Sequence, residues 1–166
     1  VALHEAENPE FKKYAKQIVA NSKALAKELL RLGFSLTTGS SENHLLVVDL
    51  SNKGINGALA AYALEQAGII TNKNTVPYDR MPPFYPSGIR IGTPAATTRG
   101  MREKDMIVLA HWMNDVIEEI KGNALPDVKE ERSPFFKEFR KKVDENKRIE
   151  QIALEVKKAM HNFPMP

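Results

Sequence analysis

Residues 86–100 read PSGIRIGTPAATTRG, and the centre of this stretch predicts both a strand and a binding site. Successive side chains on a strand point to opposite faces of the sheet, so Ile89 and Ile91 would share one face. Arg90 would stand on the other face, with a glycine two residues away on each side. We therefore expect the isoleucines to enter the core and Arg90 to lie beside open space in which a flat or bulky molecule could rest.

The rest of the pattern predicts several helices around a small sheet. Asn8 and Pro9 are typical of a helix start, and apolar residues then recur every three to four positions until Gly33. A helix of that length spans about 35 Å, which suggests a spine that joins two bodies. The other expected elements are a hairpin of strands 34–38 and 44–50, a helix over 55–67, a strand over 69–71, a helix with apolar positions from 106 to 120 that ends near Gly122, a helix that starts at Ser133-Pro134 and a helix over 149–163. The expected class is α/β (α+β).

The composition indicates one ordinary globular domain. The 166 residues are 42% hydrophobic and 27% charged, and the formal net charge is +3. Basic and acidic residues are interleaved, so we expect no nucleic-acid partner. The apolar runs are far shorter than the ~20 residues of a membrane-spanning helix, so we expect no membrane partner. The absence of cysteine suits a reducing compartment, which favours the cytoplasm, and a start at Val1 without methionine is typical of a fragment.

Residues 72–88, NKNTVPYDRMPPFYPSG, form a long segment without a repeating pattern. Loops of this length in small domains are usually functional or disordered. Four prolines restrict this backbone, and Tyr78, Phe84 and Tyr85 add flat apolar surface, so we expect a rigid aromatic rim that leads into the Arg90 strand. An arginine beside such a rim predicts a small-molecule site. The alternative is a surface arginine paired with one of the 21 acidic residues, below a loop that proline merely stiffens.

Four motifs, in order and in register, resemble the C-terminal part of serine hydroxymethyltransferase. They are SENHLLVVDL at 41–50, GIITNKNTVP at 68–77, SGIRIGTPAATTRG at 87–100 and FPMP at 163–166. This pyridoxal-phosphate enzyme interconverts serine and glycine with tetrahydrofolate, and the resemblance covers essentially the whole chain. Another enzyme of the same fold type, such as an aminotransferase, also places a carboxylate-binding arginine on its small domain. The NKNTVP segment separates the two families.

The resemblance implies a fold-type-I architecture with two domains. Residues 1–14 would be the last piece of the large pyridoxal-phosphate domain, and residues 15–166 would be the C-terminal small domain. The small domain would carry a short antiparallel sheet flanked by helices, and the long first helix would bridge the two domains. The full-length enzyme would be a homodimer or a homotetramer.

The resemblance also implies the roles of several residues. Arg90 would bind the α-carboxylate of serine or glycine, a role that suits the planar fork of arginine because it can donate two parallel hydrogen bonds. The two neighbouring glycines would clear space for substrate and cofactor. Asn74 would lie near the pterin of the folate, where an amide can both donate and accept, unless it is a plain turn residue. Pro82, Pro83 and Phe84 would lie within range of the folate.

The catalytic motifs of the family do not occur in this chain. Its Schiff-base lysine, the aspartate at the pyridine nitrogen and the histidine that stacks on the ring would all lie upstream. Lys73 is expected to be a solvated loop lysine, and no two of the four histidines have the spacing of metal ligands on one face. We therefore expect neither a catalytic residue nor a metal site in the chain. The isolated chain should be inactive, with pyridoxal phosphate bound mainly by the missing domain.

A third interpretation belongs to another functional class. Residues 137–148, KEFRKKVDENKR, could form a basic helix that serves a stand-alone interaction module for acidic partners. The charges of this segment are mixed in sign, which favours a solvated helix face instead.

Overall fold

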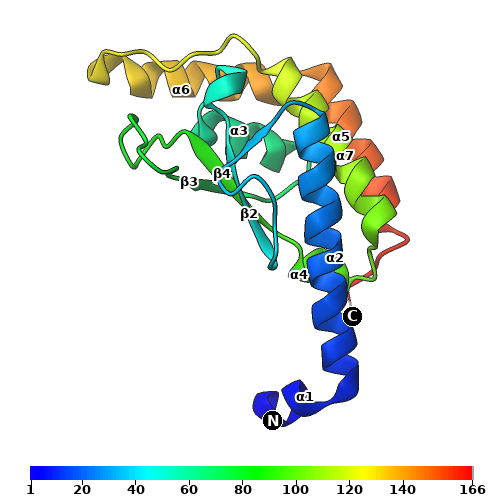
Figure 1. Ribbon diagram of the computed structural model, residues 1–166. Coiled ribbons are helices and arrows are strands. Elements are labelled where there is room, and N and C mark those ends of the chain that lie inside the picture. The colour runs from blue at the N-terminus through cyan, green and yellow to red at the C-terminus, as the bar shows by residue number, and fades with distance from the viewer. Residues whose placement is uncertain (166) are drawn as a thin grey trace.

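The computed structural model describes residues 1–165 and centres on an antiparallel sheet with the strand order β1-β2-β4-β3 (Figure 1). The strands are β1 (Ser35–Leu36), β2 (Leu45–Asp49), β3 (Asn72–Asn74) and β4 (Gly88–Gly92). The helices are α1 (Ala2–Glu7), α2 (Pro9–Arg31), the short 3-10 helix η1 (Ser51–Lys53), α3 (Gly57–Gln66), α4 (Pro94–Thr98), α5 (Glu103–Glu119), α6 (Lys129–Asp144) and α7 (Lys147–Met160). The predicted α/β class and the short antiparallel sheet flanked by helices are confirmed.

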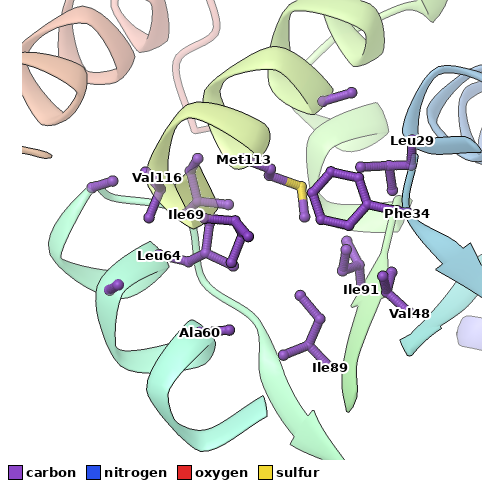
Figure 2. Close-up of a cluster of buried hydrophobic side chains, with 14 of the residues drawn as sticks. Leu29, Phe34, Val48, Ala60, Leu64, Ile69, Ile89, Ile91, Met113 and Val116 are labelled. Carbon is purple, nitrogen blue, oxygen red and sulfur yellow. The ribbon is translucent and has the colours of Figure 1, made fainter. Parts of the chain in front are cut away.

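The core lies between one face of the sheet and the helices. Ile89 and Ile91 of β4 point into it and are 0% and 6% exposed, whereas Arg90 between them is exposed. Figure 2 shows both isoleucines directed at a cluster that includes Leu64 of α3 and Met113 of α5. The alternation predicted for this strand is therefore confirmed, and the opposite face of the sheet carries Arg90.

Helix α2 begins and ends where the sequence predicts. The side chain of Asn8 accepts a hydrogen bond from the Glu10 backbone at 3.0 Å, and Gly33 after the helix has a φ of +79°, which favours glycine. The second half of α2 packs in the core through residues such as Leu25. The first turns of α2 extend away from the rest of the molecule, with α1 at the tip (Figure 1).

Two predicted element boundaries are wrong. The third strand is Asn72–Asn74 and not 69–71, because the backbone of Ile69 still donates to Leu64 at the end of α3 and pairing with β4 begins only at Asn72. Helix α6 begins at Lys129, so Pro134 lies inside the helix and does not start it. Proline removes one backbone hydrogen bond of the helix. The burial of apolar side chains after Pro134, among which Phe139 is 2% exposed, offsets this loss.

None of the helices within residues 1–165 combines the length and the apolar character that crossing a membrane requires. No group of three or more histidine, aspartate or glutamate side chains in the same range is placed to hold a metal ion.

Candidate functional site

Arg90 occupies the middle of the sheet on the face opposite the core. It pairs with Val47 of β2 on one side and with Asn72 of β3 on the other. Within residues 1–165 its guanidinium takes part in no ion pair, and none of the 21 acidic residues contacts it. The structure therefore does not support the alternative of a surface arginine paired with an acid. The charge of Arg90 is available to a ligand.

A hollow of about 350 Å³ opens on the same face of the sheet. Val47, the cross-strand partner of Arg90, lines it together with Leu45 and the hairpin loop from Thr37 to Asn43. Side chains of β2 that share the face of Val47 are half-buried, so no helix covers them. The volume falls within the range of small-molecule sites, and the wall carries hydroxyl and amide groups together with the carboxylate of Glu42, which suits a polar ligand. Arg90 itself is not among the residues that line the hollow.

The two glycines that flank Arg90 have different roles. A Cβ atom on Gly92 would meet nothing closer than Pro94 at 3.5 Å, so the face is open there, as predicted. A Cβ atom on Gly88 would lie 2.7 Å from both the Val48 carbonyl oxygen and a methyl group of Val76. The prediction that both glycines leave room for a ligand is therefore wrong for Gly88, where the neighbouring chain needs the space.

A network of buried hydrogen bonds fixes the end of β4. The hydroxyl of Thr93 donates to the carbonyl oxygen of Ile18 in α2 at 3.0 Å. One turn further along α2, the side-chain nitrogen of Asn21 donates to Thr97 at 2.8 Å and to the carbonyl oxygen of Met101 at 2.9 Å. These contacts join the long helix to the segment that follows Arg90. Sequence reasoning missed them because the partners lie more than 70 residues apart.

Asp79 holds the loop 72–88 in one conformation. One carboxylate oxygen accepts from the backbone of Ser87 at 2.9 Å and of Val76 at 3.2 Å, and the other accepts from the Ser87 hydroxyl at 2.7 Å and the Met81 backbone at 2.9 Å. Burial raises the pKa of Asp79, but the hydrogen bonds from Ser87, Met81 and Val76 outweigh it, and the net effect is a lowered pKa. Asp79 thus adds four hydrogen bonds to the backbone restriction that the prolines impose, and the rigidity of the loop stays a prediction.

Asn74 reaches the same face as Arg90. It pairs with Gly88, and Asn72 pairs with Arg90, so the register places both asparagines on the face of the guanidinium. The Asn74 side-chain nitrogen donates to the carbonyl oxygen of Thr75 at 2.6 Å, while its side-chain oxygen accepts no hydrogen bond from residues 1–165. That oxygen remains available to a ligand.

The aromatic part of the loop lies elsewhere. Lys73 pairs with Ile89 and so leaves β3 on the other face, where its ammonium donates to the carbonyl oxygen of Phe84 at 2.9 Å and lies 4.0 Å from the centre of the Phe84 ring. Phe84 also packs edge-on against Tyr85 at 4.9 Å. The prediction of an aromatic rim beside Arg90 is therefore wrong for Phe84, because the cation of Lys73 holds that ring on the helix side.

The two prolines of the predicted rim lie in a turn. Pro82 is half-buried and Pro83 is exposed. The carbonyl oxygen of Pro82 accepts from the backbone of Tyr85 at 2.8 Å. This turn follows the segment that Asp79 fixes, so the position of both prolines depends on that carboxylate.

The sequence of the chain is similar to that of one family of known proteins. The family model described as serine hydroxymethyltransferase matches residues 1–113. The chain is 48% identical over 123 residues to serine hydroxymethyltransferases of Rickettsia canadensis (strain McKiel), Rickettsia felis (strain ATCC VR-1525 / URRWXCal2) and Rickettsia akari (strain Hartford). Each alignment covers 74% of this chain and 29% of the relative, so the chain spans less than a third of the length of these proteins.

Proposed function

Because this chain belongs to the serine hydroxymethyltransferase family, we propose that it is the C-terminal part of an enzyme that interconverts serine and glycine. The one-carbon unit would pass to or from tetrahydrofolate. The observation that carries the proposal is the guanidinium of Arg90, which forms no ion pair within residues 1–165 and lies on the open face of the sheet, where its cross-strand partner Val47 lines a hollow of about 350 Å³.

Arg90 would bind and orient the amino-acid substrate. Its planar fork can donate two parallel hydrogen bonds to the α-carboxylate, which fixes both the position and the rotation of the substrate. The strand gives this group a rigid base, because β4 is paired on both sides and its following residues are tied to α2 through Thr93. Correct orientation of the α-carbon relative to the cofactor is a large part of the rate in such reactions.

The cofactor would be pyridoxal phosphate, held mainly by residues outside this chain. When bound, it supplies the electron sink that this chemistry needs. The part of the chain that the structure describes fits a supporting role, since Lys73, the lysine on the strand that pairs with β4, points to the face opposite Arg90, and its ammonium donates to the carbonyl oxygen of Phe84. This chain would therefore contribute substrate binding through Arg90, and the lysine that attaches the cofactor would come from the upstream domain.

Residues 1–14 would be the end of that upstream domain, and residues 15–166 the small domain. Helix α1 has no buried residue, and most side chains before Tyr14 are exposed, as expected if further protein covers them. The assembly would be a homodimer or a homotetramer. The absence of cysteine supports a cytoplasmic location.

The folate would contact Asn74 and the loop that holds Pro82, Pro83 and Phe84. The placement of Asn74 on the face of Arg90, with an available side-chain oxygen, supports its role toward the polar edge of the pterin. Phe84 would meet the folate only at the edge of the sheet, because its ring packs on Lys73.

The proposal is tested by comparing the full-length protein with this chain alone. The full-length protein, loaded with pyridoxal phosphate, should form glycine from serine only when tetrahydrofolate is present, and it should not transaminate α-keto acids at a comparable rate. The isolated chain should do neither and should not change the visible spectrum of pyridoxal phosphate. Efficient transamination without folate-dependent cleavage of serine would overturn the proposal in favour of an aminotransferase.

A further inference from the structure

A second hollow, of about 310 Å³, lies between α6, α3 and β3. We call it the α6 hollow. Its wall includes three cations and three aromatic rings, which are Lys73, Lys137, Arg140, Phe84, Tyr85 and Phe136. Lys73 leaves β3 on the face opposite Arg90, so this hollow is separate from the site proposed for the amino acid.

The positive charge of the α6 hollow is not neutralised by the part of the chain that the structure describes. No aspartate or glutamate within residues 1–165 lines it, and none of its three cations forms an ion pair in that range. Two of the four acidic groups on the same helix are engaged elsewhere, and the other two, Glu130 and Glu131 in its first turn, do not line the hollow. Glu138 pairs with Lys142 at 2.8 Å, and Asp144 accepts a hydrogen bond from the hydroxyl of Tyr62 at 2.6 Å.

Two of the cations are held in place by aromatic rings. The guanidinium carbon of Arg140 lies 4.9 Å from the ring centre of Tyr62 and 4.8 Å from that of Phe136. Lys73 is fixed by its hydrogen bond to Phe84 and by its position over that ring. Cations that are already ordered lose less conformational entropy when they bind a ligand, so the site is preorganised.

We propose that the α6 hollow binds a small aromatic anion, a flat ring that carries a phosphate or carboxylate group. The fork of Arg140 and the ammonium groups of Lys73 and Lys137 match an oxyanion, and the rings of Tyr85 and Phe136 match a flat apolar body. The volume lies at the small end of ligand sites, which suits a single ring. The inference does not depend on the proposed enzymatic activity.

Calorimetric titration of the full-length protein with phenyl phosphate tests the proposal, with the cofactor site loaded and free pyridoxal phosphate then removed by dialysis, because that molecule is itself a ring with a phosphate and would compete for the α6 hollow. We expect one saturable site. Inorganic phosphate, which lacks the ring, should bind at least about tenfold more weakly, and benzoate shows whether a carboxylate can replace the phosphate.

Substitutions locate the site. Lys137→Gln and Arg140→Gln should each weaken phenyl phosphate about tenfold, whereas Lys12→Gln on α2, with the same change of charge, should not. Lys137→Gln keeps the test valid if Arg140→Gln disturbs folding, because the Lys137 ammonium takes part in no ion pair within residues 1–165. Unchanged binding by Lys137→Gln, equal affinity for phosphate and phenyl phosphate, or loss of binding in Arg90→Lys would overturn the inference.

Discussion

Gly57, the first residue of α3, lies so close to Gly88, the first residue of β4, that a Cβ atom on Gly57 would overlap the Gly88 carbonyl oxygen. The backbone of Gly57 also donates a hydrogen bond to the carbonyl oxygen of Pro86 at 2.7 Å. The start of α3 is therefore pressed against the strand that carries Arg90. The position of the guanidinium depends on this contact, which requires a glycine at position 57.

We expect Gly57→Ala to destabilise the protein and to displace β4. The added methyl group meets backbone atoms, which cannot rotate away, and overpacking of this kind costs about 1–3 kcal/mol or more. Chemical denaturation measures the loss in the free energy of unfolding. Gly92→Ala is the matched control, because its Cβ atom would make only ordinary contacts, the nearest at 3.5 Å. Equal stability of the two variants would contradict the packing described for Gly57.

Asp79 should control the order of the loop 72–88 and make it depend on pH. The pKa of Asp79 is lowered in the folded state from an ordinary value of 3.8, so its carboxylate stabilises the loop above that value. The stabilisation should be lost as the pH falls below 3.8 and then through the pKa that Asp79 has in the folded protein, which is lower than 3.8. Hydrogen exchange at the Ser87 and Met81 amides measures this opening.

Variants of Asp79 separate its effect from general acid unfolding. Asp79→Ala removes the four hydrogen bonds and should speed exchange in the loop at neutral pH, at a cost of about 1–3 kcal/mol. The control is Asp127→Asn, an exposed aspartate outside the loop, which should leave exchange unchanged. If Asp79→Ala left the Ser87 amide as protected as in the natural protein, Asp79 would not be what holds the loop.

Asn74→Ala should weaken the folate-dependent reaction selectively. Loss of one amide contact to a polar ring edge is worth roughly 1–3 kcal/mol, so the KM for tetrahydrofolate should rise about ten- to a hundredfold in the full-length enzyme. Folate-independent cleavage of bulky β-hydroxy amino acids should be spared, since it needs Arg90 and the cofactor but no pterin contact. Asn72→Ala, on the same face, is the control.

The two reactions must be assayed in parallel on the same preparation of Asn74→Ala. An equal loss in both would show that Asn74 supports the fold, for example through its hydrogen bond to Thr75. No loss in either reaction would make Asn74 a plain turn residue.

The sequence predicts those features that depend on local periodicity. The alternation of Ile89, Arg90 and Ile91 follows from the two-residue repeat of a strand, and Asn8 marks the start of α2 through its own short-range hydrogen bond. It does not predict which way Phe84 turns, because that depends on Lys73 eleven residues earlier. Loop segments have no repeat from which such a contact can be derived.

Packing between segments that are distant in the chain could not be predicted from the sequence either. The sequence suggests that Gly88 leaves open space beside Arg90. In the structure, Val76 and the backbone of Val48 fill the space that a Cβ atom on Gly88 would need. The role of Asp79 depends on three partners in an irregular loop, and that of Asn21 on residues in another part of the chain. Each requires knowledge of the folded chain, since nothing in the spacing of these residues indicates a contact.

Arg90→Lys in the full-length enzyme tests the central claim most directly, through kcat/KM for serine. Lysine keeps the charge but loses the fork that orients the carboxylate, so kcat/KM should fall on the order of 10²-fold or more while the melting temperature stays unchanged. Arg80→Lys, at an exposed position in the loop, is the matched control and should retain the kcat/KM for serine. A near-normal kcat/KM for serine in Arg90→Lys would contradict the assignment of Arg90 as the group that binds the substrate carboxylate.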